Sequence, residues 1–133
     1  MKAIKSHAGR PLPHGAVVNA CDNSGARLLK IFGVKGHKTV RGRYEAAGIG
    51  DLCIASVVDG RPDMRKTVVQ AVIVRQKKAF RRPNGLRVKF EDNAAVIIKD
   101  ELSNPKGTLI KGPIPKEVTI RWPTLAKIAK IIV

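Results

Sequence analysis

The sequence is poor in aromatic residues, in acidic residues and in cysteine. Aromatic side chains make up 4% of its 133 residues, and no two of the five are neighbours. Proteins that read single-stranded nucleic acid stack bases on clustered aromatic rings, so this composition argues against that class. Acidic residues number 10 against 26 lysines and arginines, which gives a net charge of +16. So much like charge predicts a partner of opposite sign.

Long apolar runs are absent as well. No run approaches the ~18 residues that a membrane-spanning helix needs, and the N-terminal segment lacks the apolar stretch of a signal peptide. The basic residues are spread along the chain, whereas binding to a membrane surface favours one basic amphipathic helix. Nucleic acid is therefore favoured over a membrane as the partner, and a cytoplasmic location is expected.

The sequence shows no pattern typical of a metal site or a catalytic centre. Cys21 and Cys53 lie in apolar segments without C-x-x-C spacing, so both are expected to be buried, reduced thiols. His7, His14 and His37 are far apart and have no acidic or thiol partner at ligand spacing. P-loop and serine-nucleophile motifs are missing too. We therefore expect no metal, no cofactor and no enzyme activity.

Short runs of apolar and β-branched residues recur along the chain and are separated by turn residues, a pattern typical of a small β-barrel. Strands are expected within the segments 16–34 (strand, turn, strand), 51–59, 67–75, 86–90 and 93–99. The length fits a single domain, 1–133. We expect it to carry a basic N-terminal arm at 1–15 and a projecting two-stranded ribbon at 35–43.

A helix is predicted only near the C-terminus, over 122–133. Pro123 suits a first helical position, and Leu125, Ile128, Ala129 and Ile132 recur at helical spacing.

The segment 70–99 combines apolar flanks with a strongly basic middle. No acidic residue occurs from Met64 to Phe90, and Asn84-Gly85 is a strong signal for a tight hairpin turn. Basic loops with glycine and proline suit recognition of the backbone and shape of folded RNA, because phosphate contacts need no base-specific geometry. The candidate RNA-binding residues are Arg27, Lys35, Lys38, Arg41, Arg43, Arg75, Lys77, Lys78, Arg81 and Arg82.

Four stretches of the sequence resemble the universal family of large-ribosomal-subunit protein fourteen. They are "ACDNSGAR" at 20–27, "GIGDL" at 48–52, the segment 71–97 with Arg81-Arg82-Pro83 and Asn84-Gly85, and "NPKGTLIKGPIPKE" at 104–117. The longer arm before Val18, Leu109 and the ending "RWPTLAKIAKIIV" are similar to the archaeal and eukaryotic branch. The resemblance implies a closed five-stranded meander barrel, mostly β, with a projecting β-ribbon and short C-terminal helices.

The resemblance also implies a function and a set of partners. Members of that family bind large-subunit rRNA, face the small subunit at a bridge that includes small-subunit rRNA, neighbour ribosomal protein three of the large subunit, and receive anti-association factors. We expect this chain to act as a structural constituent of the cytoplasmic large subunit. Two other interpretations stay open at this point: a free translation or RNA-chaperone factor that binds structured RNA, and an RNA-modifying enzyme with an unrecognised site.

Overall fold

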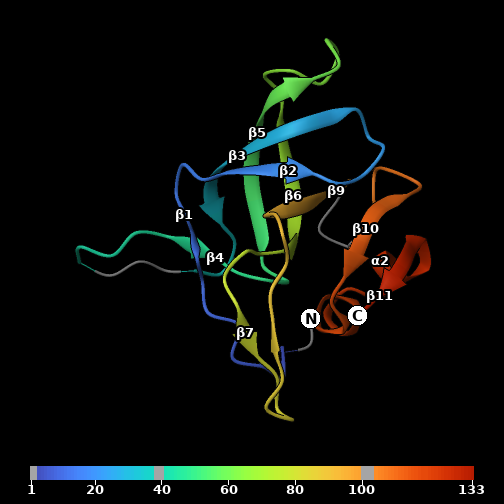
Figure 1. The fold of residues 1–133 in the computed structure, drawn as a ribbon. Coiled ribbons are helices and arrows are strands. Elements are labelled where there is room, and N and C mark those ends of the chain that lie inside the picture. Colours follow the sequence, from blue (N-terminus) through green and yellow to red (C-terminus); the bar gives the residue numbers. More distant parts are fainter. Residues whose placement is uncertain (1–2, 38–40, 100–103) are drawn as a thin grey trace.

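Five strands form a closed barrel in the computed structural model, which describes residues 3–37, 41–99 and 104–133 (Figure 1). They are β2 (Val17–Ala20), β3 (Ala26–Val34), β5 (Leu52–Gly60), β6 (Val68–Arg75) and β9 (Ala94–Ile98). Neighbours in this order pair antiparallel, and β2 and β9 close the barrel as a parallel pair. An odd number of consecutive antiparallel strands leaves the first and last parallel. The expected five-stranded meander barrel is confirmed.

The turn between β2 and β3 is tied to the strand that closes the barrel. Gly25 adopts a φ of +103°, which favours glycine. The buried Asp22 carboxylate accepts hydrogen bonds from the Ser24 hydroxyl (2.8 Å) and from the Ile97 N–H of β9 (3.1 Å). Burial raises the pKa of Asp22, and these hydrogen bonds oppose that rise. The side chain of a polar turn residue thus adds a hydrogen bond to β9, the strand that pairs with β2 to close the barrel.

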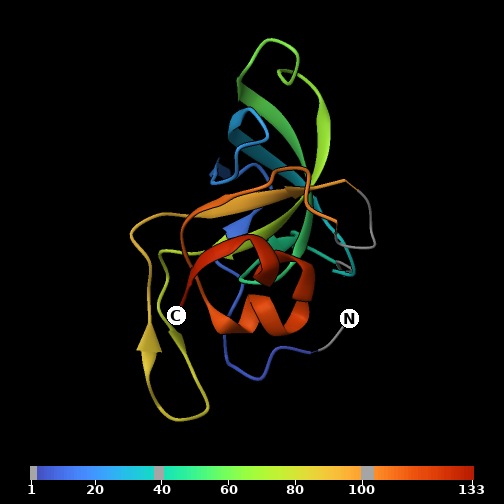
Figure 2. The same ribbon diagram turned by 90° about the vertical axis from the view of Figure 1, so that its right-hand side faces the viewer.

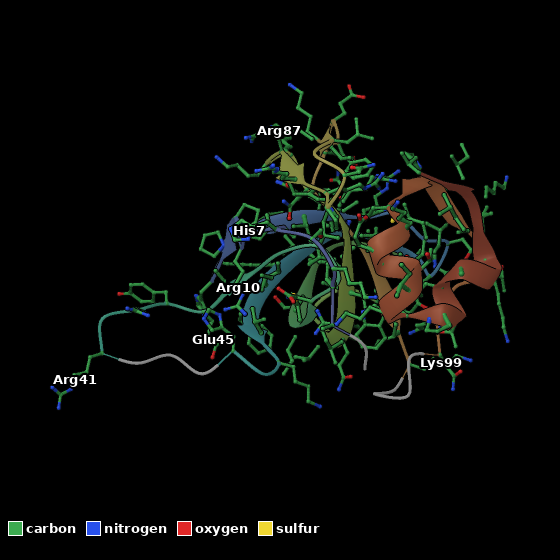
Figure 3. The ribbon with its side chains drawn as sticks, turned by 90° about the horizontal axis from the view of Figure 1, so that it is seen from below. His7, Arg10, Arg41, Glu45, Arg87 and Lys99 are labelled. Carbon is green, nitrogen blue, oxygen red and sulfur yellow. The ribbon has the colours of Figure 1, made fainter. Side chains whose placement is uncertain are left out.

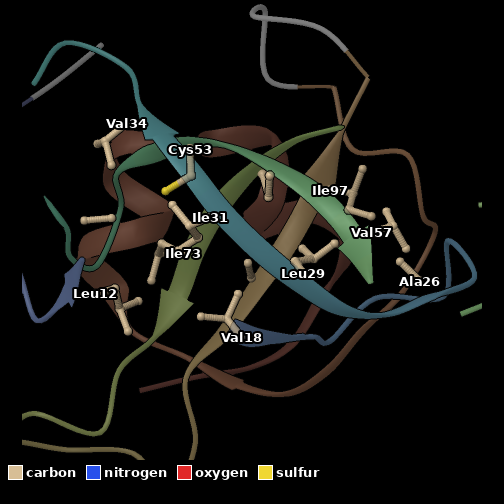
Figure 4. Close-up of a cluster of buried hydrophobic side chains, with 14 of the residues drawn as sticks. Leu12, Val18, Ala26, Leu29, Ile31, Val34, Cys53, Val57, Ile73 and Ile97 are labelled. Carbon is tan, nitrogen blue, oxygen red and sulfur yellow. The ribbon is translucent and has the colours of Figure 1, made fainter. Parts of the chain in front are cut away.

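Strand β9 and the second half of β6, from residue 71, are buried on both faces, which explains the continuous apolar runs at 71–74 and 94–98. Ile73 and Ile97 point into the barrel and pack with Leu29 and Ile31 of β3 (Figure 4). The alternate residues Val72, Val74, Val96 and Ile98 belong to a second cluster outside the barrel. That second cluster includes side chains of the C-terminal helices and of the basic hairpin.

The C-terminal region covers this outer face (Figure 2). It comprises β10 (Ile110–Ile114), α1 (Lys116–Arg121), α2 (Pro123–Ile128) and β11 (Ala129–Ile132). The helix predicted over 122–133 therefore ends at Ile128, and β11 pairs with β10 in parallel. Hydrogen bonds to β10 satisfy the backbone that would otherwise continue the helix, and the β-branched Ile131-Ile132-Val133 ending favours an extended chain. Helix α1 was not predicted from the residue pattern.

The described parts of the segment predicted as a projecting ribbon, 35–37 and 41–43, extend away from the barrel (Figure 1). Lys38, Thr39 and Val40 lie outside the described residues, and the residues on either side of them form turns instead of strands. The described chain does contain a projecting two-stranded ribbon elsewhere, formed by β7 (Phe80–Arg81) and β8 (Arg87–Val88) (Figure 2).

The N-terminal arm lies against the barrel in an extended conformation. Its β1 (Leu12–Pro13) pairs with β4 (Ala46–Ala47), and the His7 N–H donates to the Arg81 carbonyl (3.0 Å). A side chain at Gly48 would collide with the backbone of Gly9, and one at Gly50 would collide with Ile4. The "GIG" stretch thus permits the close approach of the arm.

Replacing Ile73 by Ala should lower the free energy of unfolding by about 2–5 kcal/mol, because the side chain is fully buried inside the barrel. Val68→Ala, on the same strand but 65% exposed, is the matched control and should change it by less than about 0.5 kcal/mol. Chemical denaturation of the two variants and the wild type measures both values. Equal effects at the two positions would mean that the core is assigned wrongly.

Candidate RNA interface

The basic hairpin has the turn that its sequence predicts. Gly85 has a φ of +89°, and its N–H donates to the Arg82 carbonyl (2.9 Å). The Asn84 side-chain oxygen accepts from the Leu86 N–H (3.1 Å). The hairpin at Asn84-Gly85 is therefore confirmed, and Asn84 and Gly85 serve turn geometry.

Two arginines face each other across the hairpin. Arg81 of β7 pairs in register with Arg87 of β8, and both side chains are exposed. No carboxylate within the part of the chain that the structure describes forms an ion pair with either guanidinium group. Like charges directly opposite on a two-stranded ribbon are destabilising. This arrangement favours binding of an anion between or beside them.

Further exposed cations lie on the hairpin and on the projecting segment. Lys77, Lys78 and Lys89 lie on the same hairpin, and Arg41 and Arg43 lie on the projecting segment. In Figure 3 the labelled side chains run in the order Arg87, His7, Arg10, Glu45 and Arg41. The structure thus groups Lys77, Lys78 and Arg81 of the predicted residues on the hairpin, and Arg41 and Arg43 lie on the projecting segment.

One of the predicted residues lies apart from this group, one lies at the base of the projecting segment, and one cannot be placed. Arg27 is exposed at the start of β3, beside Gly60, and in the register of β5 with β6 this is the opposite end of the barrel from Arg75, where the hairpin begins. Lys35 is exposed at the base of the projecting segment. Lys38 lies outside the described residues.

Arg82 points into the protein. Its Nε donates to the Glu117 Oε1 (2.7 Å) and its Nη2 to the Glu117 Oε2 (3.2 Å), and both side chains are buried. Nη2 also donates to the Val133 carbonyl (2.7 Å), and the guanidinium group lies 5.9 Å from the centre of the Phe80 ring. This forked ion pair fixes the base of the hairpin to α1. Arg82 therefore positions the hairpin, and its charge is already neutralised within the fold.

Arg75 is also held inside the molecule. It donates two hydrogen bonds to the Asp92 carboxylate (2.9 and 3.2 Å) and two more to the carbonyls of Lys111 and Pro113 (2.8 and 3.2 Å). Burial of Asp92 opposes its ionisation, but the hydrogen bonds and charge of Arg75, with a hydrogen bond from Asn19, outweigh burial and lower the Asp92 pKa. Through these hydrogen bonds Arg75 connects β10 to the barrel.

Gln76 is a positioning residue that sequence reasoning missed. Its side chain is fully buried, accepts from the Ile49 N–H (3.1 Å) and donates to the carbonyls of Ala8 (2.9 Å) and Lys78 (3.0 Å). One amide therefore joins the "GIG" stretch, the N-terminal arm and the hairpin. The sequence does not indicate that Gln76 is buried, because glutamine residues are usually exposed and this one is followed by lysines.

The remaining reactive groups serve the fold. Burial raises the pKa of both the Cys21 and Cys53 thiols to about 12, so neither is a ready nucleophile. Asp51 accepts from the Gly48 N–H, and Asp59 accepts from the Gly60 N–H, as turn residues do. Among the described residues no cluster of histidine, cysteine and acidic side chains could hold a metal ion, and no helix there could span a membrane.

Comparison with known proteins gives a consistent result over the whole chain. The model of the family described as ribosomal protein L14p/L23e matches residues 12–133. The chain is 55% identical to the large ribosomal subunit protein uL14 of Nanoarchaeum equitans. It is 50% and 51% identical to the proteins of the same name from Halorubrum lacusprofundi and Halobacterium salinarum. Each alignment covers 100% of this chain and 100% of the relative.

Replacing Arg82 by Ala should cost about 3–5 kcal/mol of stability, because it leaves the Glu117 carboxylate buried without its partner. Arg81→Ala, one residue away and exposed, should cost less than about 0.5 kcal/mol. The double variant Arg82→Met with Glu117→Leu should recover much of the stability, since no buried charge remains. Denaturant unfolding of the three variants tests this, and a negligible effect of Arg82→Ala would contradict the assigned role.

The Arg75–Asp92 pair should make stability depend on pH in the acid range. The pKa of Asp92 is lower in the folded state than its ordinary value of 3.8. The ionised carboxylate therefore adds to the free energy of unfolding above pH 3.8, and this addition is lost as the pH falls through the folded-state pKa. The difference in unfolding free energy between the wild type and Asp92→Asn should therefore be constant near neutral pH and shrink below pH 3.8. A difference that does not change with pH would exclude this contribution.

Proposed function

The chain belongs to the family of ribosomal protein L14p/L23e, and we propose that it binds large-subunit rRNA through the exposed cations of its hairpin and projecting segment. As a member of this family it is a structural constituent of the large subunit of the cytoplasmic ribosome, and it is not an enzyme. The proposal concerns which parts of the surface meet the RNA.

The cross-strand pair of Arg81 and Arg87 carries the proposal. Their repulsion on the hairpin is relieved when an anion lies beside them. Guanidinium groups hydrogen-bond phosphate oxygens in a forked geometry, and RNA supplies one phosphate per nucleotide along its strand. A net charge of +16 is better matched by a polyanion such as RNA than by a single acidic side chain of a protein.

The proposed interface consists of the exposed cations of the hairpin and of the projecting segment. They are Lys35, Arg41, Arg43, Lys77, Lys78, Arg81, Arg87 and Lys89. Lys38 joins them on the basis of its sequence position. Arg27, at the other end of the barrel, would meet a different part of the rRNA. Arg75 and Arg82 are left out because their guanidinium groups are engaged within the fold.

We also propose that the molecule helps to bridge to small-subunit rRNA and contacts other proteins, among them protein three of the large subunit and an anti-association factor. Apolar side chains that remain exposed in the C-terminal region support a protein contact there: Ile120 is 49% exposed, and Ile131 and Ile132 are 55% and 50% exposed. This surface lies on different elements from the basic hairpin, so RNA and protein contacts would not compete for it.

The affinity for deproteinised large-subunit rRNA should fall in the variants Arg81→Ala and Arg87→Ala. The slope of log affinity against log salt concentration should become shallower by roughly 0.7–0.9 for each phosphate that the variant no longer neutralises. Lys127→Ala, which removes one exposed charge from α2, is the control and should leave the slope unchanged. Filter binding over a range of salt concentrations measures this.

An unchanged slope in both arginine variants would count against the proposal.

A further inference from the structure

A hollow of about 460 Å³ lies beneath the N-terminal arm. Ser6, His7 and Arg10 of the arm form one side, and Asp51 and Arg121 form the other. Its size is within the range of roughly 300–1,000 Å³ that small ligands occupy in proteins. None of the hairpin cations lines it, so it is separate from the surface described above.

Two buried polar atoms without partners belong to residues of this hollow. Within the described residues, the buried side-chain atoms with no hydrogen-bond partner are the Ser6 Oγ, the Gln70 Oε1 and the Arg121 Nε. Ser6 and Arg121 both line the hollow. A hydroxyl and a guanidinium N–H can each donate, so the partner that both lack is an acceptor. Unpaired buried donors are costly, which calls for an explanation.

The hollow has more positive than negative charge. Arg10 forms no ion pair within the described residues, whereas Arg121 is paired with Asp51 and only its Nε has no partner. The Asp51 Oδ2 accepts from the Gly48 N–H (2.8 Å), and the Asp51 Oδ1 accepts from the Arg121 Nη1 (3.3 Å). The hollow therefore combines net positive charge with unused donors, and this favours an anion.

We propose that this hollow binds one phosphate group of the RNA backbone, with Arg10 and His7 at its rim and Ser6 and Arg121 as additional donors. This inference rests on the proposed RNA-binding function and adds a contact site to it. The source of the phosphate is a polynucleotide because the hollow adjoins the hairpin: Ser6 and His7 also line a neighbouring hollow with Arg81. A strand that follows the hairpin arginines can thus continue along the arm, where Figure 3 shows His7 and Arg10.

Binding requires a small shift of the arm, because the Ser6 Oγ and the Arg121 Nε are covered in the free chain. The arm is bonded near the hollow by the His7 N–H to the Arg81 carbonyl and by the Gln76 amide to the Ala8 carbonyl. Both bonds join the arm to the hairpin region, so an RNA that engages the hairpin also acts on the arm.

Ser6→Ala separates this role from a structural one. The substitution removes an unpaired buried hydroxyl, so the melting temperature of the free protein should stay the same or rise. The affinity for deproteinised large-subunit rRNA should nevertheless fall about tenfold, since the variant cannot make a hydrogen bond to the charged phosphate. A lower melting temperature with unchanged affinity would overturn the proposal.

Arg10→Ala tests the charge, and Lys5→Ala is its matched control. Lys5 is exposed on the same arm but does not line this hollow. Arg10→Ala should make the salt slope shallower by roughly 0.7–0.9, and Lys5→Ala should leave it unchanged. Equal effects of the two variants would contradict a discrete site.

Arg81→Ala, measured in parallel, distinguishes failure of this site from failure of the proposed function. A shallower slope for Arg81→Ala with a wild-type slope for Arg10→Ala would overturn the arm site and leave the function standing. Wild-type slopes for both would overturn both proposals.

Discussion

Strand β9 and the second half of β6 are buried on both faces, and the two hydrophobic clusters of the described chain meet across them. Their inward residues fill the barrel, while their outward residues hold the C-terminal helices and the base of the hairpin. Each cluster therefore stabilises the strands on which the other depends. The hairpin leaves the barrel at the end of β6 and returns at β9, so its position follows from this double packing.

The arginines of the hairpin have two roles: Arg82 holds the hairpin in place, and Arg81 and Arg87 carry exposed charge. Arg82 points inward and forms a forked ion pair with Glu117, while its neighbour Arg81 points outward and faces Arg87. The inward arginine carries no free charge and holds the ribbon against α1. The outward pair carries charge that the fold does not neutralise. A rigid support and an unsatisfied charge are what a preorganised site for a polyanion needs.

The barrel could be predicted from the sequence because its strands are apolar and β-branched and its hairpin turn has Asn-Gly. Local patterns also placed Ile73 in the core. They could not separate Arg82 from Arg81, since both occupy the same basic stretch and only the distant Glu117 distinguishes them. Strand β11 was predicted as part of a helix for a similar reason: its residues have helical spacing, but pairing with β10 decides its conformation. The roles of Gln76 and the arm depend on contacts between segments far apart in the chain.

The parallel pairing of β2 with β9 has a consequence for how the molecule folds. Asn19 pairs with Ala94, so the barrel cannot close until nearly three quarters of the chain has been synthesised. Closure over such a separation costs loop entropy before the two strands can pair, and folding through distant pairings is slow. The hairpin lies inside that loop and is anchored to α1, which comes later still. The Arg82–Glu117 pair that anchors the hairpin therefore forms only after α1 has been synthesised.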